Sequence, residues 1–165
     1  MGRILAILLI AFTASTGEAN ESKKPDALAE TFIEVVNAKD QKLQRTIVHP
    51  KCTENLSPLE ERYLSDVLRR DFRRQIPKKR QIKITDLEKG PMPFEGMMTW
   101  KVKPTHEFEI EFSTGEYSST SIIRFIAKEG DHWYIVVAFP SAEGIKLYEK
   151  RLKSQPTEKK KIIVP

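Results

Sequence analysis

The most unusual chemical feature of the sequence is a run of basic side chains between residues 69 and 80. Seven arginines and lysines fall within these twelve residues, and Asp71 is the only carboxylate among them. Guanidinium groups form paired hydrogen bonds with phosphate and carboxylate groups, so the run predicts an anion-binding surface for a lipid, a glycan or an acidic protein. The alternative is a solvated helix face, because charge runs commonly keep helices soluble. The predicted anion-binding residues are Arg69, Arg70, Arg73, Arg74, Lys78, Lys79 and Arg80.

Aromatic and apolar side chains further along the chain predict a pocket for an apolar ligand. Trp133 and Tyr134 are neighbours in an expected strand, so they point to opposite faces and at most one of them points inward. Ordinary core packing is the alternative role for the inward side chain. The predicted pocket residues are Trp100, Phe108, Ile110, Trp133 and Tyr134.

No catalytic residue can be assigned. His49 and Cys52 are three residues apart, and an imidazole beside a thiol can generate a nucleophilic thiolate. However, Pro50 lies between them and no third residue can be identified to orient the imidazole. Cys52 is the only cysteine, which excludes an intramolecular disulfide. A small buried core residue is the favoured role, and a reactive thiol or a bridge between two chains is the alternative.

Three glutamates share one face of an expected strand over residues 106–112. Glu107, Glu109 and Glu111 alternate with apolar residues, and successive carboxylates on one face lie ~7 Å apart. That spacing suits a general acid and base. The favoured interpretation is a solvated face, because the apolar side of the strand would pack on the helices.

No metal site or cofactor is expected. His49, His106 and His132 have no short ligand spacing between them, and the sequence contains neither an HExxH motif nor paired cysteines. These are the spacings typical of structural and catalytic zinc sites.

Two helices are predicted before the basic run. Pro25 suits a first helical turn, and apolar residues at spacings of three and four share a face of the segment that follows. Asp40 can cap a short second helix, which is expected to turn Leu43 and Ile47 inward and to end before Pro50. The inward residues of the first helix are Leu28, Phe32, Val35 and Val36.

A third helix is expected to position the basic run. Ser57, Pro58 and Glu60 have the arrangement of a capping box, which predicts a helix start. Apolar residues then recur at every fourth position up to Pro77, where the helix is expected to end. The apolar face holds Leu64, Leu68, Phe72 and Ile76.

The remainder of the chain predicts strands and one more helix. Short glycine-containing turns join the strands, which favours antiparallel pairing. A last helix is expected from Ser141 to about Lys153, and residues 154–165 form a basic tail with the composition of a disordered segment. The strands are predicted to begin at residue 82 and to cover residues 97–102, 106–112, 117–128 and 132–139, with a loop over 89–96.

This order of elements predicts an α+β domain with N-terminal helices packed on a curved antiparallel sheet and a C-terminal helix. Residues 32–43, and the turn from Gly130 to Trp133 into the apolar strand that follows it, resemble the nuclear-transport-factor-2-like (cystatin-like cone) superfamily, in particular its small exported members of unknown function. The resemblance covers residues 25–140 and implies a conical sheet with a pocket between its concave face and the helices. Members of this superfamily use the cavity for catalysis, for ligand binding or for docking of other proteins, so the fold leaves the activity open.

The first nineteen residues have the pattern of a secretory signal peptide. Arg3 precedes an apolar run over residues 4–12, and small residues lead up to Ala19. The run is shorter than the ~20 residues of a transmembrane helix, which makes an uncleaved anchor the weaker alternative. We therefore expect an exported protein, periplasmic or secreted, with no transmembrane anchor after cleavage and one folded domain over residues 25–153.

The charge and the elements together predict a binding function. The net charge of +5 favours anionic partners, and export argues against nucleic acid as a partner. We expect a non-enzymatic binding module, monomeric or homodimeric, whose pocket or basic helix engages a small apolar ligand or an anionic partner. The alternatives are a small hydrolase or isomerase that uses the cavity, and a protein held on an anionic surface by charge.

Overall fold

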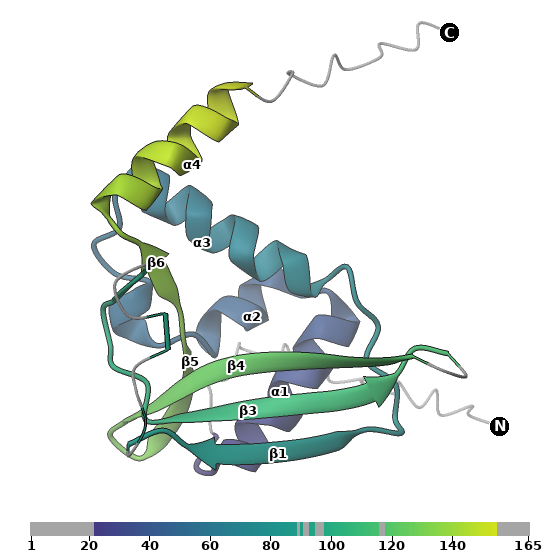
Figure 1. Cartoon of the computed structure of the whole chain (residues 1–165). Helices are drawn as coiled ribbons and strands as arrows, with labels where there is room; N and C mark the ends of the chain where they lie inside the picture. The colour runs from purple at the N-terminus through teal and green to yellow at the C-terminus, as the bar shows by residue number, and fades with distance from the viewer. Residues whose placement is uncertain (1–21, 89, 91–92, 95–97, 116–117, 155–165) are drawn as a thin grey trace, which may run out of the picture.

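The computed structural model describes residues 22–88, 90, 93–94, 98–115 and 118–154. The predicted leader, and all of the predicted tail except Ser154, lie outside the described residues. The described part confirms the predicted α+β class, with helices first, an antiparallel sheet next and a helix last (Figure 1). The helices are α1 (Pro25–Ala38), α2 (Gln41–Thr46), α3 (Pro58–Asp71) and α4 (Ala142–Ser154), and a short 3-10 turn covers Pro50–Cys52.

The strands form two antiparallel sheets. The larger sheet has the order β1-β3-β4-β5, and the smaller one pairs β2 with β6. Gly130 has a φ of 60° in the turn between β4 and β5, a left-handed conformation that glycine adopts without a steric cost. The strands are β1 (Gln81–Asp86), β2 (Met98–Trp100), β3 (His106–Ser113), β4 (Ser119–Glu129), β5 (His132–Val136) and β6 (Ala138–Pro140).

Helix α1 packs against one face of the larger sheet and forms most of the core with it. The predicted inward face of α1 is fully buried, and the ring of Phe32 lies 5.5 Å from that of Phe108 on β3. Figure 1 shows α1 behind β3 and β4. Because burying a large apolar side chain contributes about 1.5–3 kcal/mol, this contact accounts for the position of α1.

Helix α2 differs from the prediction in the direction of one side chain. Asp40 caps it as expected, accepting hydrogen bonds from two backbone N–H groups at 3.0 Å. Leu43 is 37% exposed, so its predicted inward position is wrong, and Gln44 is fully buried instead. The chain after α2 is fixed to β5 by two backbone hydrogen bonds between residues 47–49 and Ile135. Ile47 is buried as predicted. The inward position next to Leu43 is taken by Gln44, whose amide donates to the Leu68 carbonyl and to the Asp71 carboxylate.

Helix α3 begins with the predicted capping box but ends at Asp71, so the predicted end at Pro77 is wrong. Ile76 is nevertheless only 2% exposed. Its backbone N–H donates to the side-chain oxygen of Asn37, and the amide nitrogen of Asn37 donates to the Ile76 carbonyl, both at 2.9 Å. These two bonds hold the segment that follows α3, so Ile76 is buried although the helix has already ended.

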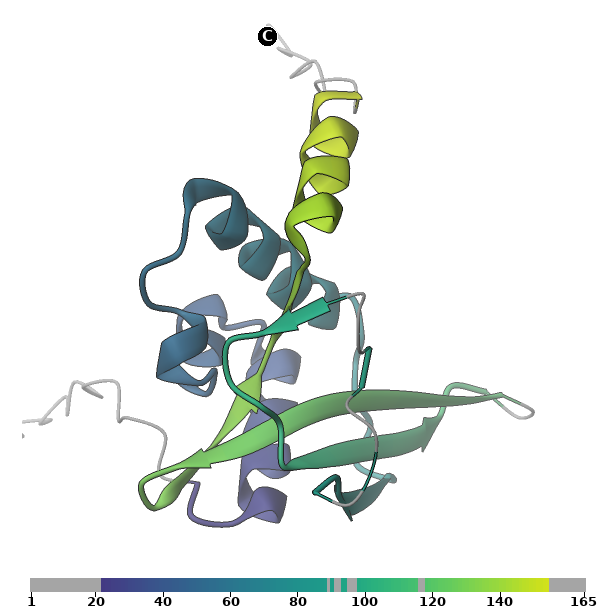
Figure 2. The same ribbon diagram turned by 60° about the vertical axis from the view of Figure 1, so that its left-hand side comes forward.

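The predicted single strand over residues 132–139 is in fact two strands. The chain leaves the larger sheet after Val136 and pairs with β2 from Ala138 onward. Helix α4 follows and packs on α3, where the ring of Tyr148 lies 5.4 Å from that of Tyr63. Figure 2 shows α4 rising from the end of β6 beside α3.

Candidate functional site

A cavity of about 530 Å³ lies between α3, β4 and the smaller sheet. Its volume is within the range of ~300–1,000 Å³ found for small-molecule sites. Strand β5 pairs only with Phe125–Glu129 of β4, so in the described chain residues 119–124 have no strand beside them on that edge. In Figure 1, α3 lies above this edge. The apolar lining includes Val67, Trp100, Ile122, Phe125, Val137 and Ala138.

One end of the cavity is aromatic. The rings of Trp100 and Phe125 lie 5.3 Å apart, and Phe94 packs against Phe125 at 5.9 Å. The indole nitrogen of Trp100 donates to the carbonyl of Pro93 at 3.0 Å, which fixes the ring. Tyr63 also lines the cavity, and burial raises the pKa of its phenol. This end therefore presents rigid aromatic surface and an uncharged hydroxyl at neutral pH.

The other end contains a buried polar cluster. Asp71, at the end of α3, is 3% exposed and pairs with Arg124 on β4. The amide nitrogen of Gln44 donates to the Asp71 carboxylate and to the Leu68 carbonyl, both at 3.1 Å. Both partners are acceptors, so these two bonds determine which way the amide of Gln44 is turned.

The two charges of this cluster balance each other. The guanidinium of Arg124 lies over the ring of Phe32 at 5.3 Å, and burial lowers the pKa of Arg124 to about 10. Arg124 is therefore still protonated at neutral pH. A buried charge is costly unless it is paired and hydrogen-bonded, and Asp71 and Arg124 supply that pairing to each other.

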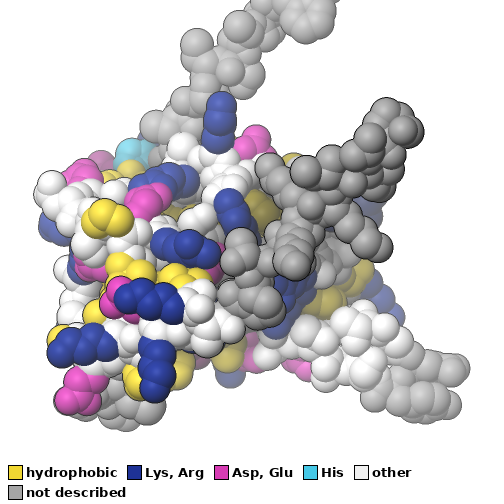
Figure 3. Space-filling view, turned by 90° about the horizontal axis from the view of Figure 1, so that it is seen from above, with side chains coloured by type: hydrophobic (Ala, Val, Ile, Leu, Met, Phe, Trp, Pro, Cys, Tyr) yellow, Lys and Arg dark blue, Asp and Glu magenta, His cyan; other side chains and the backbone are white. Residues whose placement is uncertain are grey.

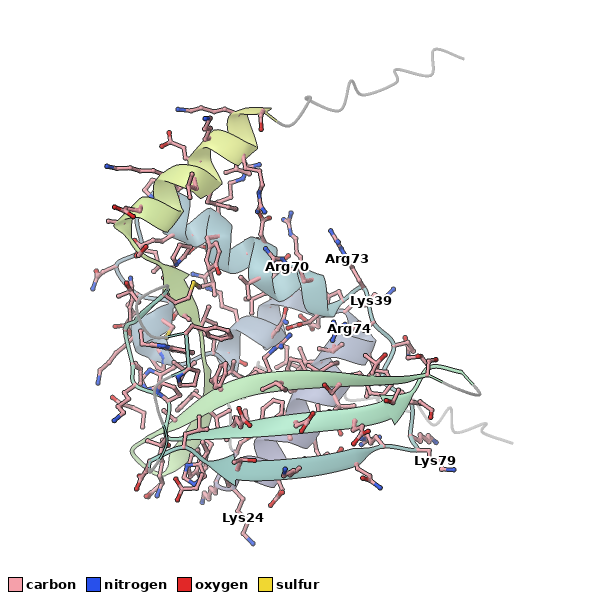
Figure 4. The ribbon with its side chains drawn as sticks, in the orientation of Figure 1. Lys24, Lys39, Arg70, Arg73, Arg74 and Lys79 are labelled. Carbon is pink, nitrogen blue, oxygen red and sulfur yellow. The ribbon has the colours of Figure 1, made fainter. Side chains whose placement is uncertain are left out.

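Two further arginines lie at the mouth of the cavity, beside the polar cluster. Arg70 and Arg74 are exposed and line the cavity, and Arg74 donates to the carbonyl of Ser121 on β4 at 3.4 Å. Among the described residues, neither arginine forms an ion pair. Figure 4 shows both at the C-terminal end of α3, with Arg74 on the side nearer β4.

The structure places one of the five predicted pocket residues on this cavity, namely Trp100. Phe108 and Ile110 are fully buried in the core beneath α1. Trp133 packs against His106 at 4.9 Å and Tyr134 packs against His49 at 5.7 Å, so these two rings face other neighbours. The remaining predicted pocket residues therefore contribute to packing elsewhere in the fold.

The predicted basic run divides into parts with different surroundings. Arg70 and Arg74 line the cavity, whereas Arg69 and Arg73 are exposed and lie outside its lining. Arg80 pairs with Glu30, and the two lysines before Arg80 are exposed. Figure 3 shows the Lys and Arg side chains of one face separated by acidic and apolar side chains, so the basic residues seen there do not form one continuous patch.

The surroundings of His49 and Cys52 do not favour a nucleophile. Cys52 is fully buried, and burial raises the pKa of its thiol, which opposes thiolate formation. The Nδ1 atom of His49 accepts a hydrogen bond from the backbone N–H of Lys51 at 3.2 Å, and Nε2 lies 3.5 Å from the carboxylate of Glu129. Both ring nitrogens of His49 therefore have neighbours other than the Cys52 thiol, which favours a structural role for the imidazole.

The three glutamates of β3 lie on the face opposite the core. Glu111 is exposed, and Glu107 and Glu109 are half-buried, whereas Phe108 and Ile110 between them are fully buried. Glu109 lies directly opposite Lys83 of β1 in the register of the sheet. This arrangement agrees with the interpretation of a solvated strand face.

Sequence reasoning missed the residues of the buried polar cluster. Asp71 stood out only as a counter-charge within the basic run, and Gln44 carried no signal in a short polar helix. Arg124 did carry a signal, because it falls between Ile122 and Ile126, which occupy inward positions of the strand and are buried. A charged residue in an inward series indicates a buried partner of opposite charge.

Within the described ranges, no group of three or more His, Cys, Asp or Glu side chains is arranged to hold a metal ion. None of the helices in the described part of the chain is both long and apolar enough to cross a membrane. Comparison with protein-family models, with curated proteins and with solved structures finds no match to this chain.

Proposed function

We propose that this protein is a non-enzymatic binding module that holds a small apolar molecule in the cavity between α3 and β4. The observation that carries the proposal is the cavity itself, about 530 Å³ with walls formed largely by side chains such as Val67, Trp100 and Phe125. Transfer of apolar surface from water into such a site is favourable by about 25 cal/mol per Å², which is the driving force for binding.

The resemblance to the nuclear-transport-factor-2-like superfamily agrees with this function, because it implies a pocket between helices and sheet. Membership of that superfamily is part of the proposal. Export is a further part, and it rests on the signal-peptide pattern of residues 1–19. Amino-terminal sequencing of the product recovered outside the cytoplasm tests it, with Asn20 as the expected first residue and an intact Met1 as the contrary result.

A hydrolase or isomerase has less support from the geometry. Ionisable groups do converge at one end of the cavity, but Asp71 is held by Arg124 and by the amide of Gln44. A carboxylate with its charge paired in this way is a weak general base. Burial raises the pKa of the Tyr63 phenol above its ordinary value, which makes it a still weaker acid at neutral pH. Binding is therefore the function that the site supports best.

The experiment uses N-phenylnaphthylamine, an uncharged dye that becomes fluorescent in apolar surroundings. Val67 and Ala138 line the cavity from α3 and β6 respectively, so Val67→Phe and Ala138→Leu should each occupy part of the space. We expect wild-type protein to bind the dye, and each of these two variants to lose most of that binding. Val67→Ala is the matched control, because it enlarges the cavity at the same position and should retain the dye.

Circular dichroism and thermal unfolding establish which variants are folded. If one cavity-filling variant fails to fold, the other still tests the proposal from a different wall. Absence of dye binding to the wild type contradicts the proposal. Undiminished binding to either folded cavity-filling variant contradicts it as well, because the dye would then occupy another surface.

A further inference from the structure

The cavity has an aromatic end and a polar end, and this difference indicates the chemistry of its ligand. Along β4 the lining residues run from Ser121, beside Arg74, through Arg124 to Phe125, beside Trp100. Along α3 the order is reversed, from Tyr63 at one end to the arginines at the other. The contacts of Arg74 with Ser121 and of Asp71 with Arg124 place the C-terminal end of α3 beside residues 121–124 of β4.

The polar end carries a surplus of positive charge. Arg124 and Asp71 neutralise each other, and among the described residues that line the cavity Asp71 is the only acidic one. Arg70 and Arg74 have no carboxylate within ion-pair distance in the described chain, and both are exposed at the mouth. Two guanidinium groups without a counter-charge, beside a cavity, fit a carboxylate, sulfonate or phosphate group.

We infer that the ligand of this cavity is an amphipathic anion, with its acidic head at Arg70 and Arg74 and its apolar body against Trp100 and Phe125. The inference rests on the proposed binding function and specifies its ligand class. Ser121 and Phe125 are four residues apart in a strand, so the two ends of the ligand are separated by about 13 Å. This length suits a fused aromatic or medium-chain aliphatic body with one acidic group.

Two dyes that share one aromatic body test the inference. Anilinonaphthalenesulfonate carries a sulfonate that N-phenylnaphthylamine lacks, so the difference in their affinities reports on the head group alone. The variant is the double substitution Arg70→Gln/Arg74→Gln. Its matched control is Arg69→Gln/Arg73→Gln, which removes the same charge from the same segment but from side chains outside the lining.

We expect the Arg70→Gln/Arg74→Gln variant to bind the anionic dye about tenfold more weakly than wild type, as the loss of two charge-assisted contacts at a partly exposed site implies. Its affinity for the uncharged dye should be unchanged. The Arg69→Gln/Arg73→Gln control should bind both dyes like wild type. Raising the salt concentration should weaken only the anionic dye in wild type, because screening acts on the head group.

The outcomes distinguish an error in the ligand's head group from the absence of a ligand site. If wild type binds the uncharged dye but Arg70→Gln/Arg74→Gln leaves the anionic dye unaffected, the anionic head is wrong and the binding function stands. Equal weakening by both double variants assigns the effect to general surface charge and also overturns the inference. Binding of neither dye to wild type removes the proposed function itself.

Discussion

The ion pair between Asp71 and Arg124 determines where the polar end of the cavity lies, and a double-mutant cycle can measure its contribution to stability. The substitutions are Asp71→Asn, which keeps an acceptor for Gln44 but removes the charge, and Arg124→Met, which keeps an apolar stem of similar length. The fourth member of the cycle carries both. The cycle isolates the pairwise interaction from the effect of each substitution alone.

The expected magnitude follows from burial. The side chain of Asp71 is 4% exposed and that of Arg124 is 25% exposed. Two unit charges ~4 Å apart interact by about 4 kcal/mol at an effective dielectric constant of ~20. Removing one partner of a buried pair typically costs 3–5 kcal/mol, and the partial exposure of Arg124 places this pair near the lower limit. We expect about 3 kcal/mol for each single variant and a coupling energy of about 2 kcal/mol.

Urea unfolding followed by circular dichroism gives the four free energies of unfolding. The exposed pair of Arg45 and Glu61 supplies the reference cycle, because its chemistry is the same while its side chains are 42% and 43% exposed. Exposed pairs contribute about 0.2–1 kcal/mol. A coupling energy for Asp71 and Arg124 below about 0.5 kcal/mol, or no larger than that of the reference pair, would refute the assignment of a buried structural pair.

Three further predictions concern other buried polar contacts. Burial lowers the pKa of His49, so the stability linked to its neutral imidazole is complete above pH ~6.5 and is lost as the pH falls below that value. The melting temperature of His49→Asn should therefore depend less on pH below ~6.5 than that of wild type. Identical pH profiles of the two proteins would contradict this prediction. Burial and a hydrogen bond to Asp66 raise the pKa of Tyr148 to about 12, so the linked stability is present below pH ~10 and is lost as the pH rises through about 12. Tyr148→Phe should therefore cost about 1 kcal/mol at neutral pH and remove from an ultraviolet titration a component that ionises near pH 12. A titration that keeps this component would contradict the assignment. Asn37→Ala leaves the N–H and C=O of buried Ile76 without partners and should cost about 2–4 kcal/mol in urea unfolding, whereas a loss below about 0.5 kcal/mol would mean that the segment is held by other contacts.

The local elements could be predicted from the sequence because their signals are local. Pro25, Asp40 and Ser57 mark helix starts within one turn of the residues they cap. The strict alternation around Phe108 fixes the inward face of β3. The prediction of α3 was too long because the apolar spacing continues to Ile76, and spacing alone cannot show that Asn37 supplies the hydrogen bonds there.

A pocket and one of its residues, Trp100, could be predicted, but the position of the cavity and the rest of its lining could not, because they depend on contacts between distant segments. The cavity exists where β5 stops pairing with β4 and the chain changes sheets at Val137. Asp71 and Arg124 are 53 residues apart in the sequence. The basic run could be recognised as a candidate anion site, but only the fold separates Arg70 and Arg74, at the cavity mouth, from the other basic residues.

The most direct test of a ligand site between α3 and β4 is an NMR titration of the two tryptophan indole N–H signals. Trp100 lines the cavity, whereas Trp133 packs against His106 outside it, and a Trp133→Phe variant assigns the signals. Addition of N-phenylnaphthylamine should shift the Trp100 signal in a saturable manner and leave the Trp133 signal in place. A Trp100 signal that does not move, or two signals that move together, would contradict a ligand site between α3 and β4.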